Sequence, residues 1–230
     1  MPVIDPPTNK TNDLYRSGEY VQHFRTAFES DAFQAIYVEK RDYVIGRFSG
    51  TGLRVLDVGG GLGRLTVPLA QRHRMTLVDL SVKMLQVAGE SGGEFARINC
   101  NAESLCFEDH SFDAVLAIDL VPHLPRLPET LLELRRVLKP GGTLLIDTTN
   151  SNPLWVLAYP RYAHPWHQPA RFIRTVIGRG VLPEWQGRIH HLSRRSFGAA
   201  LSQAGFEVFE WVPFGPTWCP KWFLAVCRAR

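Results

Sequence analysis

A short stretch of the chain combines an acidic residue with a run of glycines. Residues 55–66 read VLDVGGGLGRLT, and Asp57 lies in the third position. Glycines between a strand and a helix let a ligand approach the backbone closely. The stretch therefore predicts a cofactor site at the end of a strand, where the Asp57 carboxylate would face a cationic group of the ligand. The glycines are Gly59, Gly60, Gly61 and Gly63.

Two classes of cofactor use such a glycine-rich turn. Nicotinamide and flavin dinucleotides favour the spacing G-x-G-x-x-G, which places the pyrophosphate on a helix N-terminus. Here the spacing is G-x-G-x-G, and Arg64 stands where the third glycine of a dinucleotide site is expected. The spacing therefore disfavours a nicotinamide oxidoreductase, although a glycine-rich turn alone is weak evidence for either class.

Further polar residues follow the next predicted strands. Asp79 lies near the end of the strand predicted over residues 75–80, where a carboxylate can accept both hydroxyl groups of a ribose. Asn101 and Ala102 follow the strand predicted over residues 95–101, where the edge of an adenine would lie. These positions indicate a nucleoside-containing cofactor.

Strands and helices must alternate to bring these residues together. Apolar strands are expected at residues 53–59, 75–80, 95–101, 112–119 and 143–149. Helices are expected at residues 18–48, 62–73, 81–87 and 128–138, with a turn at 139–142. A last helix at 193–204 precedes strands at 206–212 and 221–229. Continuous apolar strands that alternate with helices are typical of a parallel sheet covered on both faces.

These motifs resemble those of the class I S-adenosylmethionine-dependent methyltransferases of the small-molecule type, similar to the enzymes of ubiquinone and menaquinone biosynthesis and of natural-product pathways. VLDVGGGLGRLT is similar to the first family motif, VDLSVKML to the ribose motif, and NAESLCFEDHSFDAV and ELRRVLKPGGTLLID to two later segments. The resemblance covers residues 50–150, with a weaker similarity in SFGAALSQAGFEVFEW. It implies a Rossmann-like three-layer α/β sandwich with a seven-stranded, mostly parallel sheet whose last strand is antiparallel, plus helical cap elements.

The resemblance also implies S-adenosyl-L-methionine as the cofactor and S-adenosyl-L-homocysteine as the product. Asp57 would hold the ammonium group of the methionine moiety, and Asp79 would hold the ribose. Asn101 stands where the family usually has Asp beside the adenine, and Ile118 would offer backbone contacts. The implied cofactor-binding residues are Asp57, Gly59, Gly60, Gly61, Gly63, Asp79, Leu80, Asn101, Ala102, Glu103, Ile118 and Tyr20.

Three histidines are candidates for the catalytic base. His123 lies just past the fourth strand, and it could act as a base or hold the loop by a hydrogen bond. His190 and His191 precede the C-terminal helix, where a base, a substrate contact and ordinary packing all remain open. Adjacent residues of an extended chain point in opposite directions, and no third ligand accompanies the pair, so no metal site is predicted.

Residues 151–192 break the alternation and are rich in Trp, Tyr, Pro, His and Arg. Their aromatic side chains could line the acceptor site or form the core of a cap of their own, and both interpretations stay open. The candidate substrate residues are Trp155, Tyr159, Tyr162, Trp166 and Trp185.

The chain divides into four expected parts. These are an N-terminal arm and helical lid at 1–48, a cofactor-binding core at 49–150, an aromatic and basic substrate cap at 151–192, and a helix and strand pair at 193–230 that completes the sheet. Tyr15 and Tyr20 are the lid candidates.

Composition narrows the class of protein. Among 230 residues, 45% are hydrophobic, which suffices for a buried core, and no apolar run reaches the ~18 residues of a membrane span. No signal peptide is visible, and the four scattered cysteines are typical of reduced thiols in a cytoplasmic protein.

Residues 1–150 hold 16 basic and 19 acidic residues, a net charge of −3, whereas residues 151–230 hold 10 basic and 3 acidic residues, a net charge of +7. The basic residues are scattered, which is typical of a solvated surface.

We predict an enzyme that transfers a methyl group from S-adenosylmethionine to a small, hydrophobic or aromatic metabolite, with oxygen favoured as the acceptor atom. Methylation of nitrogen or carbon, and a non-catalytic cofactor-binding scaffold, are the alternatives. A nucleic-acid substrate is disfavoured, because DLVPH replaces the Asn/Asp-Pro-Pro-aromatic motif of base-flipping enzymes. The sequence leaves the oligomeric state open, a homodimer included.

Overall fold

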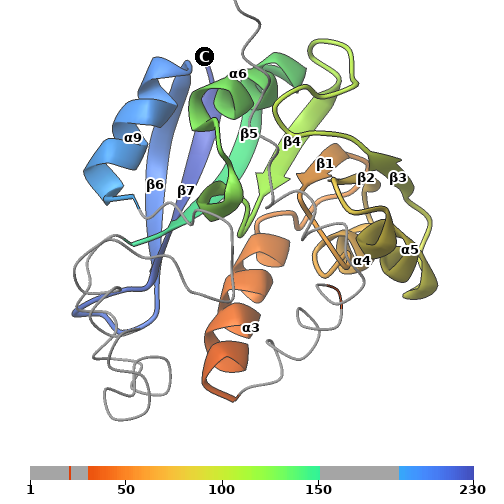
Figure 1. Ribbon diagram of the computed structural model, residues 1–230, viewed down its shortest axis with the longest axis horizontal. Coiled ribbons are helices and arrows are strands. Elements are labelled where there is room, and N and C mark those ends of the chain that lie inside the picture. The colour runs from red at the N-terminus through yellow and green to blue at the C-terminus, as the bar shows by residue number, and fades with distance from the viewer. Residues whose placement is uncertain (1–20, 22–30, 151–191) are drawn as a thin grey trace, which may run out of the picture.

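A computed structural model describes residues 21, 31–150 and 192–230 of the chain (Figure 1). A seven-stranded sheet in the order β3-β2-β1-β4-β5-β7-β6 forms its centre. Strands β1 to β5 are parallel, and β7 runs antiparallel to both of its neighbours. This confirms the expected mostly parallel sheet with an antiparallel last strand. The strands are β1 Arg54–Val58, β2 Arg74–Asp79, β3 Ala96–Asn99, β4 Phe112–Ala117, β5 Leu138–Thr149, β6 Phe206–Phe214 and β7 Trp222–Ala229.

Helices cover both faces of the sheet, which makes the expected three layers (Figure 1). One buried cluster joins α6 and α9 to one face, and a second joins α3 and α4 to the other face, where α5 also packs. Among the described residues the helices are α3 Asp31–Gly46, α4 Thr66–Leu69, α5 Val82–Glu90, the short 3-10 helix η1 Val121–His123, α6 Leu127–Val137 and α9 Arg194–Gln203.

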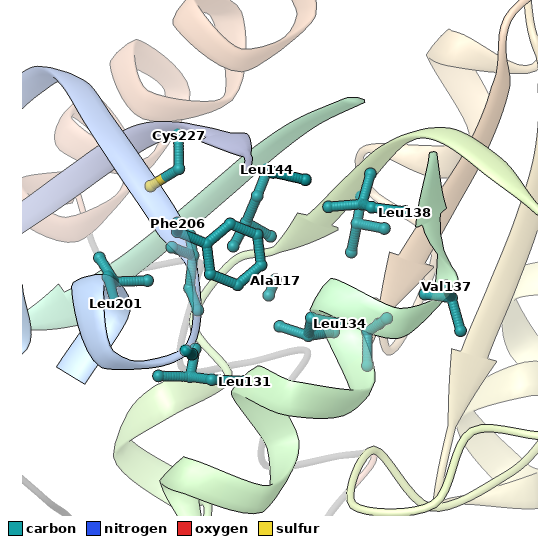
Figure 2. Packing of buried hydrophobic residues seen from close by; sticks show 14 of the residues in the cluster. Ala117, Leu131, Leu134, Val137, Leu138, Leu144, Leu201, Phe206 and Cys227 are labelled. Atoms are coloured by element: carbon teal, nitrogen blue, oxygen red, sulfur yellow. The ribbon is translucent and has the colours of Figure 1, made fainter. Parts of the chain in front are cut away.

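Figure 2 shows the side chains that join α6 and α9 to the sheet. Leucines of α6 point toward a phenylalanine at the start of β6, and every member of this cluster is buried. These buried apolar contacts hold α6 and α9 against one face of the sheet. The residues labelled in the figure are Ala117, Leu131, Leu134, Val137, Leu138, Leu144, Leu201, Phe206 and Cys227.

Two serines cap helices through their side-chain hydroxyl groups. The Ser81 hydroxyl accepts a hydrogen bond from the Met84 amide at 3.4 Å, and the Ser193 hydroxyl accepts one from Ser196 at 3.1 Å. Each bond satisfies one of the amides left unpaired at a helix start.

The helix expected over residues 62–73 is wrong in its bounds, because α4 covers only Thr66–Leu69. Gly61 and Gly63 have φ angles of 54° and 73°, in the left-handed region that interrupts a right-handed helix. Pro68 then removes one amide from the helical ladder. The glycines thus shorten the helix that the apolar pattern predicts.

The turn expected at 139–142 is instead part of β5, which begins at Leu138. Leu138 pairs with Phe112, and a register shift separates this pair from the next one, Ala114 with Thr143. The two glycines allow the bulge, since Gly141 has a φ of 75° and a Cβ on Gly142 would lie 2.8 Å from the Lys139 carbonyl oxygen.

The topology gathers the ends of several strands at one edge of the sheet. Parallel strands β1, β2, β4 and β5 all end there, and the antiparallel β7 begins there, because Trp222 pairs with Thr149 at the end of β5. In open sheets of this kind, ligands bind outside the carboxyl ends of the strands. Among the residues that the structure describes, every helix is too short or too polar to cross a bilayer.

Leu134→Ala should lower the free energy of unfolding by about 3 kcal/mol, because Leu134 is completely buried in the cluster of Figure 2 and its removal leaves a cavity. The measurement is urea denaturation followed by circular dichroism. Leu132→Ala is the matched control, since Leu132 lies in the same helix with 57% of its surface exposed, and it should cost less than about 0.5 kcal/mol. Equal losses would contradict this placement of the core.

Candidate functional site

The glycine loop, residues 59–63, follows β1 and carries one side chain, that of Leu62. Gly59, Gly61 and Gly63 all have positive φ angles, which L side chains rarely adopt. A Cβ on Gly60 would collide with the Leu77 side chain and would lie 2.5 Å from Oδ2 of Asp57. The loop therefore exposes mainly backbone at the carboxyl end of β1.

Asp57 lies beneath this loop and is almost completely buried, with 1% of its surface exposed. The Thr66 hydroxyl donates a hydrogen bond of 2.6 Å to Oδ2 of Asp57. Burial raises the pKa of Asp57 to about 6, and the nearby Asp79 adds to the rise. A cationic ligand group beside this carboxylate would stabilise its charged form.

Asp79 joins the glycine loop to the start of α5. Its Oδ2 accepts a hydrogen bond of 3.0 Å from the Gly61 amide, and its Oδ1 accepts one of 2.8 Å from the Ser81 amide. Burial raises the pKa of Asp79. The Asn99 side chain donates to the carbonyl groups of Asp79 and Leu80, both at 2.9 Å, so the end of β3 supports this turn.

The loop after β3 forms a compact turn. Oδ1 of Asn101 accepts a hydrogen bond of 3.1 Å from the Glu103 amide, and the Asn101 carbonyl accepts one of 3.0 Å from Ser104. Oε2 of Glu103 pairs with Arg126 at 2.5 Å. Oε1 of Glu103 is buried, and within the described part of the chain it has no hydrogen-bond partner. Together with half-buried Ala102, it leaves an acceptor suited to a ligand amino or hydroxyl group.

The loop after β4 begins with half-buried Ile118 and then Asp119, whose φ is 57°. The Asp119 amide donates a hydrogen bond of 2.6 Å to Oδ1 of Asp147 in β5. Lys40 of α3 lies between the two carboxylates, with its Nζ 2.5 Å from Oδ1 of Asp119 and 2.6 Å from Oδ2 of Asp147. Asp119 does not cap η1, whose N-cap is Leu120 without a side-chain hydrogen bond.

Lys40 and Asp147 are not among the site residues that the sequence predicts. Each interrupts an otherwise apolar pattern: Lys40 lies four residues before buried Val44 in α3, and Asp147 lies within the apolar strand TLLIDTT. A charged residue on a face that must be buried is the signal that could have indicated an internal ion pair.

His123 lies in η1, at the expected edge of the sheet. Burial lowers its pKa to about 4, although the charge of Asp119 opposes the shift. The imidazole is therefore neutral near pH 7 and is a weak base. This supports its alternative role in holding the loop over the role of a general base.

Several predicted residues lie outside the described residues: His190, His191, Tyr15, Tyr20, Trp155, Tyr159, Tyr162, Trp166 and Trp185. The structure thus brings together the candidates from the ends of β1, β2, β3 and β4. Among the residues that the structure describes, no group of three His, Cys, Asp or Glu side chains is placed to hold a metal ion. All four cysteines are free thiols, as expected: Cys100, Cys106, Cys219 and Cys227.

Comparison with known proteins finds relatives throughout this core. The family model described as "Methyltransferase domain" matches residues 56–146. The ubiquinone/menaquinone biosynthesis C-methyltransferase UbiE of Paracoccus denitrificans is 32% identical over 178 residues, which cover 70% of this chain and 68% of that protein. The ubiquinone biosynthesis O-methyltransferase of Xanthomonas oryzae is 34% identical over 118 residues, which cover 49% of each chain. The chain thus spans about half the length of this second relative.

A solved structure shows the same fold. The crystal structure of magnesium protoporphyrin IX methyltransferase from Synechocystis PCC 6803 with bound SAH superposes with a TM-score of 0.70. The comparison covers 96% of this chain and 98% of that one, at 16% sequence identity. At this identity, the likeness concerns the arrangement of helices and strands.

Asp57→Asn should stabilise the protein at pH 8 by about 2 kcal/mol. A folded-state pKa near 6 lies above the ordinary value of 3.8, so the carboxyl contributes stability that is complete below pH 3.8 and is lost as pH rises through 6. Asparagine carries no charge to bury, while its oxygen can still accept from Thr66. The measurement is urea unfolding of both proteins between pH 3.5 and pH 8. The gain should shrink by about half at pH 5 and vanish near pH 3.5; a gain that does not change with pH would contradict the assigned cause.

Proposed function

Because the chain belongs to the S-adenosylmethionine-dependent methyltransferases, we propose that it transfers a methyl group from S-adenosylmethionine to a small-molecule acceptor. The bound cofactor would supply an electrophilic methyl group on a sulfonium. The protein then has to bind the donor, orient it and exclude water from the reacting atoms.

The observation that carries this proposal is the fit of the glycine loop and its carboxylates to such a donor. Asp57 is a buried anion beside the glycine loop, which suits the ammonium group of an amino acid. Asp79 lies at the end of β2, where its carboxylate can accept ribose hydroxyl groups in addition to its two backbone amides. Among the described residues, Oε1 of Glu103 has no hydrogen-bond partner, and it offers an acceptor where we propose that the adenine lies.

The chain's own residues would prepare the site before any ligand arrives. Hydrogen bonds from Gly61 and Ser81 hold the Asp79 carboxylate, and Thr66 holds that of Asp57. Fixed groups of this kind lose little conformational entropy when a ligand binds. Ile118 would contribute backbone contacts, and Leu80, Asn101 and Ala102 would border the nucleoside.

For the acceptor, we propose a hydrophobic, aromatic hydroxyl compound. The names of the relatives in ubiquinone biosynthesis support this class, because one is an O-methyltransferase and another a C-methyltransferase. We propose that residues 49–150 hold the cofactor and that the aromatic segment 151–192 borders the acceptor. His190 and His191 are the proposed base or substrate contacts, whereas His123 is proposed to hold the loop.

Asp79→Ala should weaken the binding of S-adenosylhomocysteine by roughly 30-fold, because a charged acceptor for the ribose is lost. The measurement is isothermal titration calorimetry. Asp113→Ala is the matched control, since this carboxylate pairs with Lys139 at the opposite end of β4 and should leave the affinity unchanged. Near-normal affinity in Asp79→Ala would contradict the ribose assignment.

The acceptor is tested by incubating the protein and labelled S-adenosylmethionine with a panel of catechols, hydroquinones and hydroxylated quinones. Transfer of one methyl group to an aromatic hydroxyl, identified by mass spectrometry and nuclear magnetic resonance, is the expected result. A methyl group on carbon or nitrogen would overturn the proposed acceptor atom. Cofactor binding without transfer to any member of the panel would favour a non-catalytic scaffold.

A further inference from the structure

Lys40 joins three elements at the carboxyl edge of the sheet. It belongs to α3, and only 1% of its surface is exposed. Its ammonium group pairs with Asp119 after β4 and with Asp147 in β5, at 2.5 and 2.6 Å. Asp147 is completely buried, whereas the Asp119 side chain is 30% exposed. The ion pair therefore connects a helix, a central strand and the loop that follows its neighbour.

The two acids keep Lys40 charged in spite of its burial. Desolvation alone would lower the pKa of Lys40, but the two carboxylates raise it above its ordinary value. Burial raises the pKa of Asp147 to about 6, and Lys40 opposes that rise. Without Lys40, the carboxylates of Asp119 and Asp147 would lie close together without the cation between them. The lysine thus favours the ionised form of both acids.

Asp119 is held in an unusual backbone conformation by these contacts. Its φ of 57° lies in the left-handed region, which residues other than glycine rarely adopt. The Asp119 amide is bound by Asp147, and the Asp119 carboxylate is bound by Lys40, so both its backbone and its side chain are held. Such a conformation persists only where the surroundings determine it.

The direction of the chain at Asp119 decides where its neighbours lie. Ile118 precedes it, and Leu120 follows it with a side chain that packs against the glycine loop: a Cβ on Gly59 would lie 2.8 Å from Cδ1 of Leu120. A loop released at Asp119 would therefore change its contact with the glycine loop.

Helix α3, which carries Lys40, also contacts the residue that follows the glycine loop. The guanidinium of Arg64, the residue after Gly63, lies 5.3 Å from the centre of the Tyr37 ring in α3. Tyr37 lies three residues before Lys40, on the same side of the helix. Helix α3 thus contacts both loops that shape the candidate cofactor site.

We propose that Lys40 is a positioning residue for cofactor binding: through its ion pairs with Asp119 and Asp147, it holds residues 118–123 in the conformation that completes the site. This inference rests on the proposed function only in taking S-adenosylmethionine to bind at this edge. The Lys40 ammonium group is already bound by both acids, so Lys40 acts through Asp119.

The first test is Lys40→Met, which keeps the length and apolar stem of the side chain but removes its charge. If the loop then occupies the competent conformation a tenth of the time, the affinity for S-adenosylhomocysteine falls about tenfold. Calorimetry well below the melting temperature of each protein measures this change. Hydrogen exchange at the Asp119 amide should accelerate in the same variant without any ligand, because its acceptor is no longer held in place.

Tyr43→Phe is the matched control within α3. It removes the hydrogen bond of 2.8 Å from the Tyr43 hydroxyl to Glu210 of β6, away from both loops. It should lower the melting temperature slightly while leaving the affinity and the Asp119 exchange unchanged. An equal loss of affinity in Tyr43→Phe would overturn the proposal, because the effect of Lys40 would then reflect only the docking of α3.

Asp147→Asn tests the inference if Lys40→Met does not fold. Asp147 accepts from the Asp119 amide through Oδ1 and from Lys40 through Oδ2. Asparagine replaces one of these oxygens with an NH2 donor, so in the same position it loses one of the two hydrogen bonds. A loss of affinity of about threefold or more, with faster exchange at Asp119, is expected. Unchanged affinity or unchanged exchange in a folded variant would overturn the proposal. If the wild-type protein does not bind S-adenosylhomocysteine, the proposed function fails, whereas the exchange measurement still decides whether Lys40 holds the loop.

Discussion

Buried negative charge at the carboxyl edge of the sheet is the constraint on which the rest of the site depends. Asp57 and Asp147 are both almost completely buried, and burial raises the pKa of each to about 6. The protein neutralises Asp147 with its own cation, Lys40, but Asp57 receives a neutral hydroxyl hydrogen bond from Thr66. An uncompensated buried charge is costly, and such costs are typically kept at functional sites. The contrast therefore separates a structural acid from an acid that suits a cationic ligand.

The glycine loop follows from the same constraint. A side chain on Gly60 would collide with the Asp57 carboxylate, and the Gly61 amide is bound by Asp79. Two acids from neighbouring parallel strands thus decide where the loop runs and which of its amides are already bound. The loop cannot carry a side chain at Gly60, because Leu77 and the Asp57 carboxylate occupy the space there. The glycines therefore leave space for the Asp57 carboxylate and present an amide to Asp79, in addition to exposing backbone to a ligand.

Local patterns were sufficient to predict most of the fold and the position of Asp57 and Asp79 at the ends of β1 and β2. Apolar strands alternating with helices indicated the sheet, and the acids Asp57 and Asp79 were found because each directly follows an apolar run. The role of Lys40 could not be predicted in this way. Its partners Asp119 and Asp147 lie 79 and 107 positions further along the chain, and no periodic pattern connects them to it. The helix predicted at 62–73 failed for a local reason: the hydrophobic pattern continues through glycines and a proline that cannot sustain helical hydrogen bonds.

The two halves of the edge differ in what compensates their charge. Around β1 and β2, carboxylates are held by a hydroxyl group and by backbone amides, which leaves net negative charge for a cationic donor. Around β5 and the start of β7, the single positive charge of Lys40 is shared by the carboxylates of Asp119 and Asp147, and the Trp222 ring lies 4.9 Å from its ammonium group. Burial also lowers the pKa of the neighbouring Lys221 well below its ordinary value, which weakens positive charge there. The two halves thus differ in the source of compensation, which is a lysine of the chain at β5 and hydroxyl and amide hydrogen bonds at β1 and β2.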